Sequence, residues 1–203
     1  SLRERGFLPQ DDVVEKKLIV ILGLLGDFDS LEYVRELVEI LPKLKKSKIS
    51  LTVIAIGSLS GAEKFSEFTR LPKRSLHIRY DDFLHKELQL CPGLRLASSS
   101  WINMLLMCAG VSSPGTLKEV LRGYTGDKKS RQLIFNSEDI RILFFPRVNG
   151  KLFSFACGDG YLRPFELATV RLSHMIEVMS NWKLYMGEGE YLTNRGGTFL
   201  LGE

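Results

Sequence analysis

The sequence predicts an α/β protein, because apolar runs typical of buried strands alternate with segments of helical periodicity. Residues 18–22 (LIVIL) and 51–56 (LTVIAI) are the strand-like runs. A helical segment separates them, and a second one follows at 61–69 with Phe65 and Phe68 on its inner side. Strand, helix, strand and helix at this spacing indicate a parallel βαβ unit.

The first helix is expected to begin near Leu31, after a turn at residues 26–30. Asp29 or Ser30 is expected to be its N-cap, because short polar side chains accept hydrogen bonds from the first free backbone amides. Pro42 is expected to kink or end the helix. Apolar residues at helical spacing define its buried face: Leu31, Val34, Leu37, Val38, Leu41 and Leu44.

Shorter elements are expected farther along the chain. Residues 75–80 are typical of a third strand, and Asp82 is placed to cap a short helix that extends to about residue 89. Residues 133–135 and 140–145 are again strand-like.

Residues 91–130 break this alternation and are interpreted as an insertion. Within it, Thr116 and Glu119 have the spacing of a capping box, which predicts a short helix ending at Gly123.

The last third of the chain is expected to contain a hairpin and a long helix. Asn149-Gly150 predicts a type I′ turn into a strand at 152–156. Pro164 fits the first position of the helix, because its missing N–H would be unpaired there. The expected apolar face of that helix is Phe165, Ala168, Leu172, Met175, Ile176, Met179 and Trp182.

These signals predict three regions. Residues 1–17 form a polar N-terminal arm, and residues 18–186 form one domain that carries the insertion at 91–130. Residues 187–203 are a glycine-rich tail, which is expected to be weakly structured by itself. A length of 203 residues suits one domain with a sizeable core.

Composition limits the classes of function. The hydrophobic fraction of 44% and the charged fraction of 26% are ordinary for a globular protein, and no apolar run approaches a membrane span. A net charge of +4 is too small to indicate nucleic acid, so the lysine clusters at 43–48 and 128–131 are interpreted as solvated surface. The sequence has three cysteines, Cys91, Cys108 and Cys157, and no two of them form a C-x-x-C pair. An odd number of widely spaced cysteines favours a reducing compartment.

Five short motifs stand in order along the chain: GDFDSLEY at 26–33, LLMCAG at 105–110, SPGT at 113–116, RGYTGD at 122–127 and RPFELAT at 163–169. On these motifs, over almost its full length, the chain resembles the AhpC/TSA-type, peroxiredoxin-like proteins of cyanobacteria and chloroplasts, a branch of the thioredoxin-like superfamily. The resemblance implies a thioredoxin-like fold, with a central mixed sheet flanked by helices. It also implies a chloroplast location, in the stroma or at the stromal face of the thylakoid, with the transit peptide absent from this chain.

The resemblance identifies one corner where redox chemistry would be expected. Relatives with intact chemistry carry Gly-Cys-x-x-Cys where the first strand meets the first helix, because a helix N-terminus stabilises a thiolate. Aligned residue by residue, Asp27 stands at the first cysteine position and Ser30 at the second. Neither side chain is oxidised and reduced as a thiol is. We therefore expect no catalytic residue and no cofactor at this degenerate corner.

Two interpretations of the acidic corner remain open. Asp27 and Asp29 are either helix caps, or part of a remodelled pocket for a cation, a basic side chain or a partner. Two cysteines are fallback thiols: Cys91, which precedes Pro92 at an expected helix end, and Cys157, which ends a strand-like run. A structural role is favoured for both thiols.

Partner binding is expected at Trp101, Met104, Phe28 and Asp27. The stretch that contains Trp101 and Met104 is equally consistent with a core helix and with an interface, where tryptophan and methionine are enriched. No metal site is expected, since the spacing of the nearest candidate ligands matches no zinc pattern. Those candidates are His77, Asp81, Asp82 and His85.

Two hypotheses of function follow. The first is a redox-inactive binding or auxiliary factor for the assembly, repair or stabilisation of a photosynthetic membrane complex. Peripheral association with the membrane is compatible with this hypothesis. The second is a thiol-dependent, peroxiredoxin-like antioxidant enzyme that uses Cys91 or Cys157. The first is favoured, because a thiol away from the corner has neither the position of the lost cysteine nor the activating helix dipole.

Overall fold

The computed structural model describes residues 16–111, 115–140, 147–186 and 190–202, without the side chains of Phe28 and Cys108. The chain divides into two compact units. The first comprises Ser1–Asn103 and Trp182–Glu203, and the second comprises Met104–Asn181.

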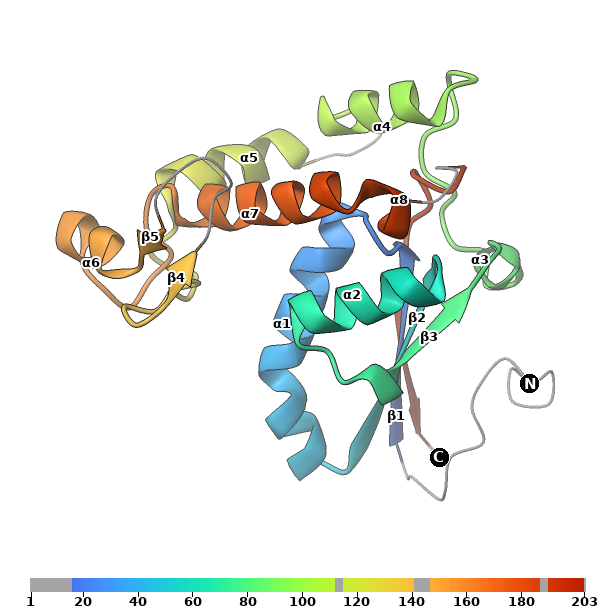
Figure 1. Ribbon diagram of the computed structural model, residues 1–203, viewed down its shortest axis with the longest axis horizontal. Helices are drawn as coiled ribbons and strands as arrows, with labels where there is room; N and C mark the ends of the chain where they lie inside the picture. The colour runs from blue at the N-terminus through green and yellow to red at the C-terminus, as the bar shows by residue number, and fades with distance from the viewer. Residues whose placement is uncertain (1–15, 112–114, 141–146, 187–189, 203) are drawn as a thin grey trace. The chain divides into compact units, whose positions relative to one another are not determined.

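The first unit is built on a four-stranded sheet in the order β3-β2-β1-β6 (Figure 1). Its strands are β1 (Lys16–Leu24), β2 (Ile49–Ile56), β3 (Leu76–Arg79) and β6 (Gly197–Gly202). β2 is parallel to β1 and to β3, whereas β6 runs antiparallel to β1, so the sheet is mixed. The chain is therefore an α/β protein, and the predicted parallel βαβ unit is confirmed.

Both faces of the two central strands are buried, which explains why their sequences are continuously apolar. Val20 lies opposite Val53 and Ile21 opposite Ile54 in the parallel register. Ile21 and Ile54 pack with Leu84 on one side of the sheet. Because side chains alternate along a strand, Val20 and Val53 face the other side, where they are also buried.

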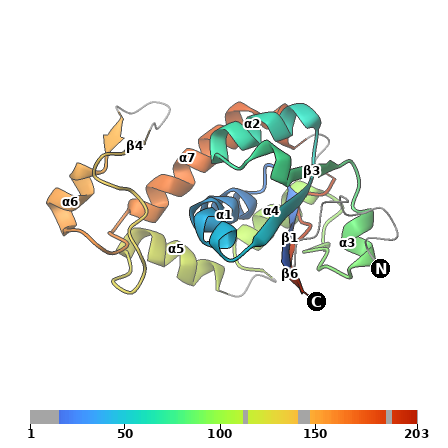
Figure 2. The ribbon, with the colours of Figure 1, turned by 90° about the horizontal axis from the view of Figure 1, so that it is seen from below.

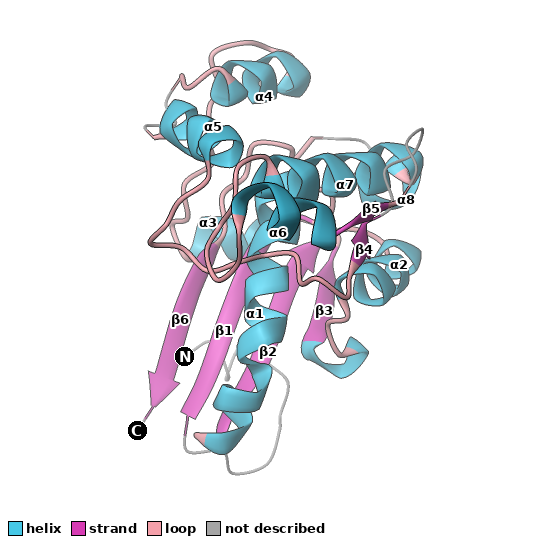
Figure 3. Ribbon diagram, turned by 90° about the vertical axis from the view of Figure 1, so that its left-hand side faces the viewer, coloured by secondary structure: helices cyan, strands magenta, loops and turns pink. Residues whose placement is uncertain are grey.

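Helices cover both faces of this sheet. α1 (Phe28–Lys46) and α2 (Leu59–Thr69) lie on one face, and α3 (Phe83–Glu87) lies on the other (Figure 2). Figure 3 shows α1 crossing in front of the strands. α8 (Trp182–Tyr185) packs on α2, and a short 3-10 turn at Lys73–Ser75 precedes β3.

α1 begins earlier than the sequence predicts. Asp27 occupies the N-cap position in place of Asp29 or Ser30. The predicted apolar face is confirmed, with Leu31, Val34 and Leu37 buried. Pro42 lies inside the helix, so of the two predicted effects, a kink or an end of the helix, the end is excluded. Proline costs one backbone hydrogen bond there, and the half-buried Leu44 continues the packed face beyond it.

The glycine-rich tail contributes the fourth strand. In the antiparallel register, Gly197 lies opposite Ile21 and Gly202 opposite Lys16. The tail lacks strand periodicity of its own, but β1 supplies a row of backbone hydrogen-bonding partners. Its pairing with a distant strand therefore orders a segment that was expected to be weakly structured alone.

The second unit contains α5 (Thr116–Thr125), α6 (Lys151–Cys157), α7 (Glu166–Ser180) and a small antiparallel sheet of β4 (Asp139–Ile140) and β5 (Val148–Asn149). α4 (Ser100–Cys108) crosses the division between the units. Ile134, Phe153 and Val170 form a core cluster. Residues 133–135 are not a strand, and of the predicted strand at 140–145 the positions after 140 lie outside the described residues.

The predicted hairpin at Asn149-Gly150 is wrong. Gly150 has φ −57°, whereas a type I′ turn needs positive φ, and the segment expected as a strand is helix α6. The Asn149 side-chain oxygen accepts the backbone amide of Lys151 at 2.9 Å, which turns the chain into that helix.

The predicted capping box in α5 is also wrong. Gly115 occupies the N-cap position, and the helix continues past Gly123. Glu119 binds Arg122 at 2.7 Å instead of reaching back to the helix start, so its charge is used along the helix face.

α7 buries a different face from the one predicted. Its first residue is Glu166, with Phe165 at the N-cap, so Pro164 precedes the helix. Four residues of the expected apolar face are exposed: Phe165, Leu172, Met175 and Met179. The buried side includes the polar residues Glu166 and His174, which a hydrophobicity pattern assigns to solvent.

Candidate partner-binding site at the start of α1

Asp27 marks the corner at which the central strand β1 gives way to α1. Its backbone amide donates to the carbonyl of Leu24 at 3.0 Å, and its own carbonyl accepts the amide of Leu31 at 3.2 Å. The Ser30 hydroxyl donates to the Asp27 carboxylate at 3.3 Å. Asp27 and Ser30 therefore interact as carboxylate and hydroxyl.

Asp27 occupies the N-cap position of α1 without a side-chain capping hydrogen bond, so the capping interpretation is supported by position alone. The carboxylate is thus a side chain held at the positive end of the helix dipole, with Ser30 as its hydrogen-bond donor.

Burial, and to a smaller extent the negative charge of Asp29, raise the pKa of Asp27 to about 7. The charge of Arg195, the backbone amide of Asp29 and the hydroxyl of Ser30 lower this pKa and so act in the opposite direction. Asp27 as a residue is partly buried. Near neutral pH this group exchanges a proton, which an ordinary aspartate does not.

Arg195 connects the corner to two distant segments. Its Nη1 donates to Oδ2 of Asp29 at 2.7 Å, and its backbone amide donates to the carbonyl of Cys91 at 3.0 Å. The helix start, the loop at Cys91 and the segment before β6 are therefore held together within the first unit. Sequence reasoning missed Arg195, because 166 residues separate it from Asp29.

Two glycines allow this close packing. A Cβ atom on Gly26 would lie 2.8 Å from the Cβ of Tyr185, and one on Gly23 would collide with the carbonyl of Asn194. Real Cβ atoms do not approach so closely, so the corner requires glycine at both positions. Gly26 opens the motif on which the family resemblance begins.

The two fallback thiols belong to different units. Cys91 is exposed and lies in the first unit, close to Arg195 through the backbone bond, whereas Cys157 is partly buried in the second. Neither forms a disulfide.

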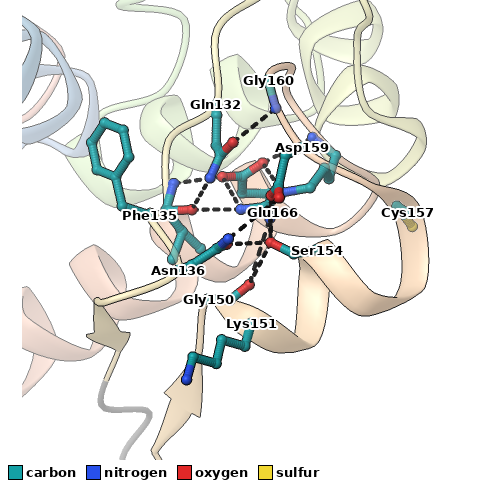
Figure 4. Close-up of polar contacts among 12 residues, drawn as sticks. Gln132, Phe135, Asn136, Gly150, Lys151, Ser154, Cys157, Asp159, Gly160 and Glu166 are labelled. Carbon is teal, nitrogen blue, oxygen red and sulfur yellow. Dashed lines mark hydrogen bonds and ion pairs between the residues drawn. The ribbon is translucent and has the colours of Figure 1, made fainter.

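Cys157 ends α6 beside a dense polar cluster (Figure 4). Arg163 and Glu166 are fully buried at its centre and form an ion pair of 3.1 Å. The Ser154 hydroxyl accepts from Arg163 Nη1 at 2.7 Å and donates to Asp159 at 2.5 Å. Sequence reasoning singled out the RPFE motif but not this pairing, whose signal is opposite charges three residues apart.

The cluster is a structural device. Glu166 Oε1 accepts the backbone amides of Leu133 and Ile134, and its Oε2 accepts the amide of Arg163. The guanidinium of Arg163 also stacks over Phe153, 5.4 Å from the ring centroid. Since the buried charges are satisfied within the chain, they hold the 131–135 loop against α7.

Trp101 is the exposed residue of the predicted partner-binding set. It is 43% exposed and stacks on Trp182, with ring centroids 4.6 Å apart. Met104 is half-buried, and the side chain of Phe28 lies outside the described residues. On the other side of α4, the Asn103 side chain makes two hydrogen bonds to the backbone of Ala97 and fixes the helix start.

The suggested metal ligands are engaged elsewhere. His85 Nε2 pairs with the carbonyl of Leu22 at 2.9 Å, and burial lowers the pKa of this imidazole. Asp82 binds Lys86 at 2.7 Å. Within the described part of the chain, no three potential ligands gather in metal-binding geometry.

A scan against protein-family models and searches of curated proteins and solved structures found no match to this chain. None of the described helices is long and apolar enough to cross a bilayer.

Proposed function

We propose that this chain is a redox-inactive, thioredoxin-like protein of the AhpC/TSA-type, peroxiredoxin-like branch, which acts by binding a protein partner. The mixed sheet flanked by helices supports this fold. The start of α1 at the end of the central strand β1 supports it further, because redox members of the superfamily hold their thiolate at such a corner.

The observation that carries the proposal is the composition of that corner. Asp27 and Ser30 interact there, and Arg195 binds the neighbouring Asp29. Peroxide reduction needs a sulfur that forms a sulfenic acid and is then regenerated by another thiol. A carboxylate and a hydroxyl do neither, so the corner serves for shape and binding.

The partner is a photosynthetic membrane complex of the chloroplast, approached at the stromal face of the thylakoid during assembly, repair or stabilisation. The family resemblance supports the compartment. The exposed ring of Trp101, stacked on Trp182, supports a binding surface, because aromatic side chains are enriched at interfaces.

The experiment is recovery of the tagged protein from thylakoid membranes with its bound complex. Trp101→Ala is expected to lose that complex, whereas the matched variant Leu96→Ala, also at an exposed apolar residue of the first unit, should retain it. Recovery of no complex with the unmodified chain would contradict the proposal.

One observation favours a second candidate, a thiol-dependent antioxidant. Cys91 is exposed, and its backbone carbonyl accepts the amide of Arg195, the residue whose side chain reaches the corner. Its thiolate would attack a peroxide oxygen, become a sulfenic acid and release water or an alcohol, with thioredoxin supplying the electrons. Peroxide consumption that is lost in Cys91→Ser or Cys157→Ser would establish this candidate over the binding protein.

A further inference from the structure

The helix α5 carries an exposed apolar stripe. We define the stripe as Leu117, Val120, Leu121 and Tyr124, four exposed residues spaced as one side of a helix. Phe165 extends it, because its exposed ring meets that of Tyr124 edge-on with centroids 5.8 Å apart. A contiguous apolar surface of this kind marks an interaction site.

The stripe is not the side on which α5 packs within its unit. Gly123 is the buried residue of the helix, and a Cβ there would lie 3.7 Å from the backbone of Ala168 and 3.9 Å from Leu167. α7 therefore contacts α5 along the Gly123 side. At 100° per residue, Leu117 and Leu121 are turned well away from that side.

Basic residues border the stripe. Residues 116–131 contain five lysines and arginines against two acids. Both acids, Glu119 and Asp127, pair with Arg122, at 2.7 and 3.7 Å. Lys118 on the helix and Lys128 and Lys129 in the segment just after it are exposed, so the region around α5 carries a positive charge.

We propose that α5 docks on an anionic lipid surface, with the stripe inserted among the acyl chains and the lysines at the headgroups. An apolar helix face bordered by lysines is the pattern of interfacial helices. Tyr124 and Phe165 at one end of the stripe suit the headgroup boundary, where aromatic rings are enriched. This inference rests on α5, the lysines that follow it and Phe165, and it does not need the proposed function.

Lipid fits this surface better than an acidic protein does. A free guanidinium can bind a partner carboxylate through two parallel hydrogen bonds. The guanidinium of Arg122 already donates two hydrogen bonds to Glu119 and one to Ser130 at 3.1 Å. Three of the five basic residues in this segment are lysines, whose flexible ammonium groups need no partner of fixed geometry.

The test is sedimentation of the 203-residue chain with vesicles, one set of phosphatidylcholine alone and one of equal parts phosphatidylcholine and phosphatidylglycerol. Binding is expected only to the anionic vesicles and should weaken as salt is raised. Lys128→Ala with Lys129→Ala should reduce the affinity roughly 25-fold, at about fivefold per lysine. Leu117→Ser with Leu121→Ser should reduce it by at least about tenfold.

Matched controls lie in the first unit. Lys45→Ala with Lys46→Ala removes the same charge, and Leu59→Ser with Leu96→Ser removes two leucines of similar exposure. Both controls should bind as the unmodified chain does. The proposal is overturned if no vesicle binds, if the controls weaken binding equally, or if an acidic protein binds the stripe in place of lipid. A fall in melting temperature for Leu117→Ser with Leu121→Ser also overturns it, because the stripe would then be packed within the protein.

Discussion

Asp29 and Arg195 form an ion pair of 2.7 Å between residues 166 positions apart in the sequence. Asp29 lies in the first turn of α1, and Arg195 lies just before β6. The pair therefore ties the start of the helix to the C-terminal segment beside the carboxylate of Asp27. Both the electrostatics and the shape of the corner depend on chain segments from opposite ends of the sequence.

Replacement of Arg195 should change the acidity of Asp27 more than the stability of the protein. Arg195 lowers the pKa of Asp27 against the effects of burial and of Asp29, so Arg195→Gln should raise that pKa above about 7. The Asp29 side chain is largely exposed, so losing the pair should cost no more than about 1 kcal/mol of unfolding free energy. The carboxyl carbon shift of Asp27, followed by NMR across pH, measures the change. Arg74→Gln, at an exposed arginine elsewhere in the unit, should leave the titration where it is.

Stability should fall with rising pH because of Asp27. The pKa of this group is 3.8 in an ordinary setting and about 7 in the folded chain, so between these values the folded state holds more protons than the unfolded state. Its contribution is fully present below about pH 4 and is lost as the pH rises to about 7. Each pKa unit corresponds to about 1.4 kcal/mol, which is an upper bound for a partly exposed residue.

Urea unfolding at a series of pH values checks this dependence. Asp27→Asn should remove the fall between about pH 4 and pH 7. Asp29→Asn should move the fall to lower pH, because the charge of Asp29 raises the pKa of Asp27. An unchanged pH profile in Asp27→Asn would show that another group is responsible.

The sequence predicts elements whose stability is local in origin. Continuous apolar runs predict the strands around Val20 and Val53, and apolar residues at helical spacing predict the buried face of α1. Both patterns can be seen within the element itself. The face of α7 does not follow, because its buried side includes Glu166, a charge held by backbone amides of another loop. The strand predicted at residues 152–156 is a helix. The hydrogen bond from the backbone amide of Lys151 to the side chain of Asn149 starts that helix where the sequence pattern suggests a strand.

The same distinction applies to the candidate site. Asp27 and Ser30 are read directly from the motif, because they stand in one turn of chain. Arg195 and the contact between Gly26 and Tyr185 depend on long-range packing, which neither spacing nor composition indicates. The motif at residues 26–33 includes such a packing position, Gly26, so that part of its sequence is determined by packing and not by chemistry.

Disruption of the buried ion pair in the second unit should be costly. Arg163 and Glu166 have no exposed side-chain surface, so removing the charge of Glu166 leaves the buried guanidinium with the half-exposed Asp159, 3.3 Å away, as its carboxylate partner. Glu166→Gln should lower the free energy of unfolding by about 3–5 kcal/mol. Chemical denaturation followed by circular dichroism measures the loss. Glu119→Gln breaks a partly exposed pair in the same unit and should cost about 1 kcal/mol or less; equal losses in the two variants would contradict the structural role of the buried pair.

Gly126 and Gly158 allow backbone strain to be separated from packing. Their backbones are nearly identical, with φ 76° and ψ −179° at Gly126 and φ 86° and ψ −171° at Gly158. A Cβ on Gly126 would lie 2.6 Å from the carbonyl oxygen of Leu162, whereas one on Gly158 would meet nothing within 4 Å. Both alanine variants should therefore carry the strain of a conformation that favours glycine, on the order of 1–3 kcal/mol.

Only Gly126→Ala should carry an additional loss, because the obstructing atom is backbone and cannot turn aside. The isolated bridge between Asp127 and Leu162, whose amide-to-carbonyl distance is 2.7 Å, would have to open. Hydrogen exchange at the Asp127 amide should accelerate in Gly126→Ala and remain slow in Gly158→Ala. If both variants lose the same stability and Asp127 stays protected in each, backbone strain alone explains why glycine stands at position 126 in the RGYTGD motif.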